Sequence, residues 1–306
     1  MAVIEVHRLH KRYRDHVAVH DVSFAVEEGE IFGILGPNGA GKTTTVECIE
    51  GLRSSDGGTI SVLGLDPQRD RAELRRVLGI QLQASELPEK MRVGEAVELF
   101  ASFYPAPADA RELTARWGLA TKWRTPFGAL SGGQKQRLSI VLALVGNPRV
   151  AILDELTTGL DPQARRDSWA AIEQIRAAGV TVVLVTHFME EAERLCDRLA
   201  VIDAGRVVAV DSPAGLVASL PGAQRLRFHP SVPVDDALLT VLPEAESVRR
   251  IGRQVEVTGR GNLLHAVTTV LARHQIVAID LRLEQASLDD AFLALTGRPS
   301  ENRGPR

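Results

Sequence analysis

Apolar residues in the larger, N-terminal part of the chain fall in short, nearly continuous runs. VAILDE (150–155), TVVLVT (181–186) and LAVID (199–203) have the composition of strands that are buried on both faces. The spacing of apolar residues between these runs predicts helices at 162–178 and 188–197. Strands that alternate with helices in this way predict an α/β fold with a mostly parallel core sheet.

Two other segments of this part follow different patterns. Residues 3–35 contain short strand-like runs separated by turns, which predicts an antiparallel β subdomain. Residues 92–145 lack strand character and have the pattern of successive helices, with a proline- and alanine-rich break at 105–108. We therefore expect a helical lobe, at about 84–145, inserted into the α/β domain.

The pattern changes again near Gly222. The remaining sequence predicts strand, helix, strand, strand, helix and strand in that order, followed by a final helix at 287–297. This β-α-β-β-α-β order predicts a small accessory α+β domain of ferredoxin-like order at 221–298. It follows a domain at 1–220, and we expect the tail at 299–306 to be disordered.

Composition narrows the class of protein. The 306 residues, 44% of them hydrophobic, suffice for one large domain and a smaller one. The net charge of −3 gives no general attraction to nucleic acid, so we expect no nucleic-acid partner. Cys48 and Cys196 are too few for a disulfide framework. Since no apolar run reaches the about 18 residues of a membrane span, we do not expect the chain to cross a membrane by itself.

A glycine-rich segment between a predicted strand and a predicted helix has the spacing G-x-x-x-x-G-K-[ST]. It consists of Gly36, Pro37, Asn38, Gly39, Ala40, Gly41, Lys42 and Thr43, and Thr44 follows it. Glycines let backbone N–H groups turn toward phosphate oxygens, and the start of a helix favours negative charge. Lys42 is expected to bind the β- and γ-phosphates, and the Thr43 hydroxyl to ligate Mg²⁺.

The alternative for this segment is a glycine-rich turn before an ordinary helix. The choice of Lys42 argues against it, because the chain has 5 lysines and 31 arginines. A compact ammonium fits between phosphates where a broad guanidinium does not.

Polar residues follow three predicted strands, at the sheet edge where ligands of open α/β sheets bind. Asp154 is expected to hold Mg²⁺ and Glu155 to polarise an attacking water, although both could belong to a solvated acidic turn. Gln83 is expected to reach Mg²⁺ or the water; Gln81 points the same way by period two, and a plain polar strand end remains possible. His187 is expected to contact the γ-phosphate unless it is an isolated helix-capping histidine.

With LSGGQ at 130–134 and TTGLDP at 157–162, the chain resembles the nucleotide-binding subunit of an ABC transporter over residues 1–220. The resemblance implies that ATP and Mg²⁺ lie between two subunits that pair head to tail. The residues that it places opposite the γ-phosphate held by Lys42 of the other subunit are Ser131, Gly132, Gly133 and Gln134. Ser131 is also a favourable N-cap before exposed backbone N–H groups, so the local physics agrees, although a capped helix alone would have the same sequence.

The resemblance assigns further residues. It implies that Asp161 reaches across the dimer and that the ring of Tyr13 stacks on adenine, although a tyrosine on a strand surface is an alternative for the latter. Leu156 is a departure, because the family usually has proline after the glutamate, and proline would stiffen the turn that carries Glu155. Since Glu155 is present, we expect both sites of a homodimer to be competent for hydrolysis.

The C-terminal extension narrows the resemblance. Its last segment, LEQASLDDAFLALTG (283–297), is similar to one in the ATPase subunits of ABC-2-type exporters, including the daunorubicin/doxorubicin efflux type. This implies an ATPase at the cytoplasmic face of the cell membrane that energises export of a drug, lipid or polymer. The membrane-spanning partners would be separate chains, and the second ATP-binding subunit would be either a copy or a paralogue.

Two other classes of protein share some of these motifs. The first is a soluble ABC ATPase that acts on nucleic acid or ribosomes, and the second is a regulator that binds ATP without hydrolysing it. The single nucleotide-binding unit, with only 46 residues between Gln83 and Leu130 and no cysteine cluster, disfavours the first class. Glu155 and His187 disfavour the second.

Overall fold

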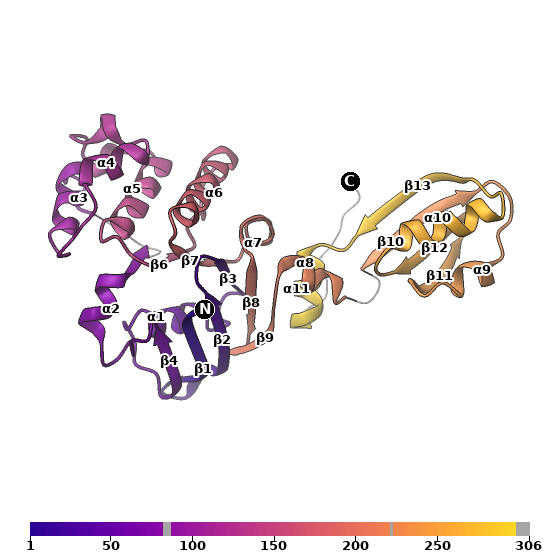
Figure 1. Ribbon diagram of the computed structural model, residues 1–306, viewed down its shortest axis with the longest axis horizontal. Helices are drawn as coiled ribbons and strands as arrows, with labels where there is room; N and C mark the ends of the chain where they lie inside the picture. The colour runs from indigo at the N-terminus through magenta and orange to yellow at the C-terminus, as the bar shows by residue number, and fades with distance from the viewer. Residues whose placement is uncertain (82–86, 221–222, 298–306) are drawn as a thin grey trace. The chain divides into compact units, whose positions relative to one another are not determined.

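The chain forms two compact units, Met1–Ser212 and Pro213–Arg306, in a computed structural model that describes residues 1–81, 87–220 and 223–297 (Figure 1). The sequence places the boundary at about residue 220, whereas the units divide between Ser212 and Pro213. The difference comes from helix α8 (Pro213–Ala218), which packs against α11 (Leu288–Thr296) of the C-terminal unit. Residues 221–222 and the predicted tail at 299–306 lie outside the described residues.

A nine-stranded mixed sheet is the centre of the N-terminal unit. Its order is β4-β1-β2-β9-β8-β3-β7-β6-β5. The strands are β1 (Ala2–Tyr13), β2 (His16–Glu27), β3 (Ile31–Leu35), β4 (Gly57–Val62), β5 (Leu78–Gln81), β6 (Val150–Asp154), β7 (Thr181–Thr186), β8 (Arg198–Asp203) and β9 (Arg206–Asp211).

Strand direction divides this sheet into two parts. β8, β3, β7, β6 and β5 are parallel neighbours, and Ile34 in the central strand β3 pairs with both Val185 and Ala200. β4, β1 and β2 are antiparallel neighbours. The parallel core and the antiparallel subdomain are therefore as predicted. β9 is antiparallel to β8 and forms a hairpin with it, a direction that its apolar pattern does not specify.

Helices complete the N-terminal unit. α1 (Lys42–Ile49), α2 (Arg71–Val77), α6 (Pro162–Ala177) and α7 (Met189–Leu195) connect the strands. The predicted helical lobe is formed by α3 (Val93–Ala101), α4 (Ala110–Arg116) and α5 (Gly132–Leu144), which pack against one another, with the short 3₁₀ turns η1 (Ala120–Lys122) and η2 (Phe127–Ala129). Within the described residues, no helix is both long enough and apolar enough to span a membrane.

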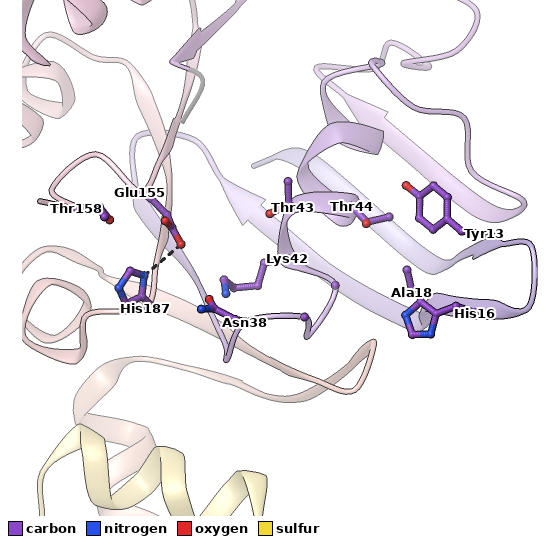
Figure 2. Close-up of a pocket in the computed structure, with 12 residues that line it drawn as sticks. Tyr13, His16, Ala18, Asn38, Lys42, Thr43, Thr44, Glu155, Thr158 and His187 are labelled. Carbon is purple, nitrogen blue, oxygen red and sulfur yellow. Dashed lines mark hydrogen bonds and ion pairs between the residues drawn. The ribbon is translucent and has the colours of Figure 1, made fainter. Parts of the chain in front are cut away.

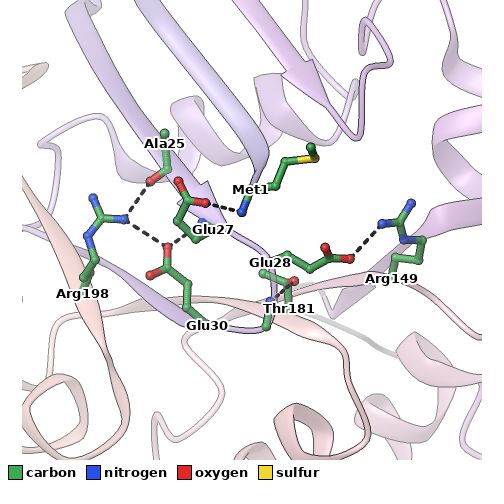
Figure 3. A network of polar contacts seen from close by, with 9 residues as sticks. Met1, Ala25, Glu27, Glu28, Glu30, Arg149, Thr181 and Arg198 are labelled. Atoms are coloured by element: carbon green, nitrogen blue, oxygen red, sulfur yellow. Dashed lines mark hydrogen bonds and ion pairs between the residues drawn. The ribbon is translucent and has the colours of Figure 1, made fainter.

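A polar network fixes the end of the parallel strands opposite their carboxyl ends (Figure 3). The carboxylate of Glu30, just before β3, accepts from the backbone N–H of Glu27 at 2.7 Å and from the Arg198 guanidinium at 3.4 Å. Glu28 pairs with Arg149, just before β6, at 2.9 Å. These contacts join the turn between β2 and β3 to the starts of β6 and β8, so the strand that leads into the glycine-rich loop is fixed to its neighbours.

The C-terminal unit contains a second, four-stranded antiparallel sheet of order β11-β12-β10-β13. Its strands are β10 (Gln224–Pro230), β11 (Ala245–Ile251), β12 (Gln254–Gly259) and β13 (Ala278–Gln285), and its helices are α9 (Asp236–Thr240), α10 (Leu263–Arg273), α8 and α11. The first strand lies between the third and the fourth, which is the ferredoxin-like order that the sequence predicts. Leu226, Phe228 and Val257 on the sheet and Leu271 on α10 belong to its buried core.

Candidate functional site

The glycine-rich loop leaves β3 after Leu35 and enters α1 at Lys42. A Cβ on Gly36 would lie 2.2 Å from the backbone oxygen of Ile202, so no larger residue fits there. Gly41 has φ of +99°, and a Cβ on it would lie 2.5 Å from the backbone oxygen of Ala18. The two glycines are thus required by close backbone approach, and at Gly41 also by the left-handed conformation.

Lys42 is the first residue of α1, and its side chain is buried. Its Nζ donates to the backbone oxygens of Gly36 at 2.7 Å and Pro37 at 3.1 Å, so the ammonium lies inside the curve of its own loop. Burial lowers the pKa of Lys42, and the nearby carboxylates of Glu155 and Asp154 oppose this shift.

A cavity of about 660 Å³ opens beside this loop (Figure 2). The residues from the predicted set that line it are Tyr13, Asn38, Gly39, Gly41, Lys42, Thr43, Thr44, Glu155 and His187. The structure thus brings the end of β1, the glycine-rich loop and the ends of β6 and β7 to one place. The volume lies within the about 300–1,000 Å³ range of small-molecule sites.

Three lining residues were missed by the sequence analysis. His16 and Ala18 line the cavity from β2, and Thr158 lines it from the TTGLDP segment. His16 and Ala18 follow Tyr13 across a tight β1–β2 turn, and that hairpin was the signal that could have found them. Thr158 lies three residues after Glu155, in a motif that was assigned only through Asp161.

Asp154 and Glu155 occupy the end of β6 and the turn after it. The side chain of Asp154 is buried, and burial raises its pKa to about 6, with a further contribution from the neighbouring Glu155 carboxylate. Glu155 has φ of +47°, and its backbone N–H donates to the oxygen of Val185 at 2.9 Å. Leu156, which replaces the usual proline, is completely buried, so packing anchors the turn where a proline ring would have stiffened it.

His187 lies directly beside Glu155. The Nδ1 atom of His187 is 3.1 Å from Oε1 of Glu155, within hydrogen-bond distance (Figure 2). The two groups line the same side of the cavity, and the ring of His187 also contacts Phe188, with the ring centres 4.2 Å apart. The histidine is therefore held by side-chain contacts as well as by its place after β7.

A buried acidic residue behind the loop was also missed. Glu50 follows α1 and is 6% exposed, and burial raises its pKa to about 8, with further contributions from Asp154 and Glu47. Sequence reasoning had no signal for Glu50, because its burial depends on how α1 packs on the sheet.

The LSGGQ segment begins α5 in the helical lobe. Ser131 is the N-cap: its Oγ accepts from the backbone N–H of Gln134 at 3.3 Å, and the Gln134 side chain accepts from the backbone N–H of Ser131 at 3.1 Å. Ser131 and Gly132 are exposed, and a Cβ on Gly132 would meet no atom within 4 Å. Within the described residues, none of this segment lines the 660 Å³ cavity.

Asp161 also does not line the cavity. Asp161 is the exposed N-cap of α6, and its Oδ1 accepts from the backbone N–H groups of Gln163 and Ala164, each at 2.9 Å. Gln83 lies outside the described residues. Gln81, its neighbour by period two, is the last residue of β5 and is buried.

Comparison with known proteins assigns the family. The ABC transporter family matches residues 19–158. The Nod factor export ATP-binding protein I of Burkholderia orbicola (strain AU 1054) is 37% identical over 311 residues, which cover 99% of each chain. The solved structure of an ATP-binding subunit of an ABC transporter is similar with 30% identity and a TM-score of 0.64, over 70% of this chain and 91% of that one.

A second similar solved structure contains the products of ATP hydrolysis. It is the dimeric post-hydrolysis state of an ATP-binding cassette bound to ADP and Pi, similar with 25% identity and a TM-score of 0.61, over 68% of this chain and 98% of that one. By these matches the chain belongs to the ATP-binding subunits of ABC transporters, and it is an ATPase.

Proposed function

We propose that the 660 Å³ cavity is the ATP site and that it binds Mg²⁺ together with the nucleotide. The donor set fits: an exposed hydroxyl on Thr43 and a buried carboxylate on Asp154 are oxygen ligands of the kind that Mg²⁺ accepts beside phosphates. Gln83 completes the proposed metal ligands. When bound, Mg²⁺ supplies positive charge that neutralises the phosphate oxygens.

The loop residues hold the phosphates in this proposal. The backbone of the loop, of which Asn38, Gly39 and Gly41 line the cavity, and the hydroxyls of Thr43 and Thr44 surround the phosphates. Lys42 exchanges its contacts with the loop carbonyls for phosphate oxygens. Tyr13 lines the far side of the cavity and offers an aromatic face for adenine (Figure 2).

Hydrolysis depends on Glu155 and His187 in the same proposal. Glu155 accepts a proton from the attacking water, and His187 orients the carboxylate through the 3.1 Å contact and reaches the γ-phosphate. Gln83 helps to position the water. Glu155 and His187 follow adjacent parallel strands, so the sheet itself sets their spacing.

The observation that carries the proposed assembly is the position of the LSGGQ segment. The exposed N-terminus of α5, with Ser131 and Gly132 at its tip, has the features of an anion site, yet it does not line the cavity of its own chain. We infer that it closes the ATP site of a second subunit, with Gly133 and Gln134 beside it and Asp161 also reaching across. The similarity to a dimeric ATP-binding cassette supports this arrangement.

We further propose that the dimer energises export through separate membrane-spanning chains at the cytoplasmic face of the membrane. The match to Nod factor export ATP-binding proteins over nearly the full chain supports export, and it does not favour a soluble ABC ATPase that acts on nucleic acid or ribosomes. The class of cargo is a hydrophobic compound, a lipid or a polymer. The second subunit is a copy of this chain or a paralogue.

Replacement of Glu155 by Gln tests directly whether ATP is bound between two subunits. The variant keeps the size and hydrogen-bonding capacity of the side chain but cannot accept a proton, so ATP should stay intact and the dimer should persist. Size-exclusion chromatography with saturating ATP and Mg²⁺ should then show a dimer for Glu155→Gln and a monomer for Glu155→Gln combined with Ser131→Arg. A monomer for Glu155→Gln alone, or a dimer for the double variant, would contradict the proposed assembly.

A further inference from the structure

The C-terminal unit contains a cavity of its own, of about 410 Å³. It lies at one end of the four-stranded sheet, where β10 ends, β13 begins and the β11–β12 hairpin turns. The loop at 231–233 forms another wall. The volume is at the small end of the about 300–1,000 Å³ range of ligand sites, so any ligand must be small.

One side of this cavity is cationic. Arg253 stands in the two-residue turn between β11 and β12, and among the described residues it has no ion pair. Arg250 is held in place by Asp236, whose Oδ1 accepts at 2.8 Å, and by the backbone oxygen of Val234. No carboxylate belongs to the lining, so the side chains that face the cavity favour an anion.

His229 also lines the cavity. Its Nδ1 atom is buried, and in the part of the chain that the structure describes this atom has no hydrogen-bond partner. His229 pairs with Ile279 across the β10–β13 ladder, which places it at the same end of the sheet as the hairpin turn.

Several other lining residues are apolar. Val232 and Ile279 line the cavity and are 52% and 48% exposed, and Pro230 and Pro233 lie beside them. The loop that carries Val232 is fixed, because Ser231 and Val277 exchange two hydrogen bonds, of 2.9 and 3.0 Å. This apolar wall is therefore preformed, and a short alkyl chain would remove it from water.

We propose that this cavity binds a small amphipathic anion. Its carboxylate or phosphate head lies at Arg253, and its short alkyl chain packs against Val232 and Ile279. The site is independent of the nucleotide, and it gives the accessory unit a ligand of its own.

Calorimetric titration of the full chain with octanoate and with octyl phosphate tests the proposal. At least one of the two should bind saturably, and the preferred one identifies the head group. Acetate and inorganic phosphate, which lack the alkyl chain, should bind at least about tenfold more weakly. The proposal would be overturned if neither octanoate nor octyl phosphate bound saturably. It would also be overturned if acetate or inorganic phosphate bound as tightly as the probe with the alkyl chain.

Matched variants locate the binding. Arg253→Gln should weaken binding of the preferred probe about tenfold, because it removes a charge-assisted hydrogen bond. Arg273→Gln removes the same charge from the exposed end of α10, outside the cavity, and should leave binding unchanged. Val232→Ser should weaken binding of the alkyl probes several-fold.

The circular dichroism and thermal unfolding of each variant should equal those of the unaltered chain, which shows that the C-terminal unit is folded, and the ATPase rate should also be unchanged. If the two arginine variants bind alike, the site is elsewhere and the proposal fails. Because the readout is binding of a non-nucleotide probe, this result is separate from that of the Glu155→Gln experiment.

Discussion

Glu155 and His187 lie 3.1 Å apart although 31 residues separate them in the sequence. Glu155 follows β6 and His187 follows β7, and these strands are parallel neighbours in which Asp154 pairs with Val185. The backbone N–H of Glu155 also donates to Val185. The contact between the two side chains is therefore a result of strand register.

His187→Ala is expected to lower kcat for ATP hydrolysis by about 10²-fold, because Glu155 loses the group that orients it. The apparent affinity for ATP should change much less. Steady-state kinetics with varied ATP separates the two effects. His274→Ala, an exposed histidine at the end of α10, is the control and should keep the original rate. A kcat within about twofold of the original for His187→Ala would contradict the role.

Lys42→Arg is expected to weaken nucleotide binding at least tenfold although the charge is kept. The Nζ of Lys42 lies between two loop carbonyls at 2.7 and 3.1 Å in a buried position, and a planar guanidinium does not fit the same space. Titration with a fluorescent ATP analogue measures the effect. Lys90→Arg, at an exposed position, should bind as the original chain does. Equal affinities for both variants would show that the space around Lys42 is not restrictive.

Substituting alanine for Gly41 and, separately, for Gly132 distinguishes a glycine needed for folding from one needed for contact with a second subunit. Gly41→Ala should lower the free energy of unfolding by about 1–3 kcal/mol, because the residue has φ of +99° and its Cβ would meet the oxygen of Ala18. Gly132→Ala has open space around the new methyl group and should keep the free energy of unfolding of the original chain. If a second subunit lies close to Gly132, the methyl group should hinder that contact and lower the rate of ATP hydrolysis. Thermal unfolding and ATPase assays measure the two properties. A Gly132→Ala variant with full activity would argue against a tight contact at the LSGGQ segment.

Glu50 predicts a pH dependence of stability. Its pKa is about 8 in the folded chain against an ordinary value of 4.5, so unfolding releases a proton between these values. Through this group the free energy of unfolding falls as the pH rises from about 4.5 to about 8. Glu50→Gln removes that effect, and its stability relative to the original chain should increase between pH 5 and pH 8 by an amount on the order of a few kcal/mol.

Urea unfolding at several pH values, without nucleotide, measures this difference. Glu98→Gln, at an exposed position on α3, is the control and should follow the original chain at every pH. A stability difference between Glu50→Gln and the original chain that does not change with pH would contradict the assignment of the shift to Glu50.

The fold was largely predictable because its signals are local. Continuous apolar runs such as β6 and β7 specify buried strands, and glycine spacing marks the loop before α1. The direction of β9 and the packing of α8 on α11 were not predictable, because both depend on contacts between distant segments.

The same distinction holds for the candidate site. Asp154, Glu155 and His187 stand at predicted strand ends; strand register places Glu155 beside His187, whereas Asp154 does not line the cavity. Glu50 had no local signal, because its burial depends on packing, whereas the tight turn after Tyr13 could have pointed to His16. Gln83 remains a prediction outside the described residues.

The constraints on Gly36 and Gly41 have a consequence for how this chain can vary. Both glycines face main-chain oxygens, of Ile202 and Ala18, and those oxygens are present whatever side chains these positions carry. Substituting side chains in β2 or β8 therefore leaves these backbone oxygens close to Gly36 and Gly41. Adding or deleting a single residue in either strand would shift the oxygen and deform the loop, so these strands should tolerate substitution far better than changes of length.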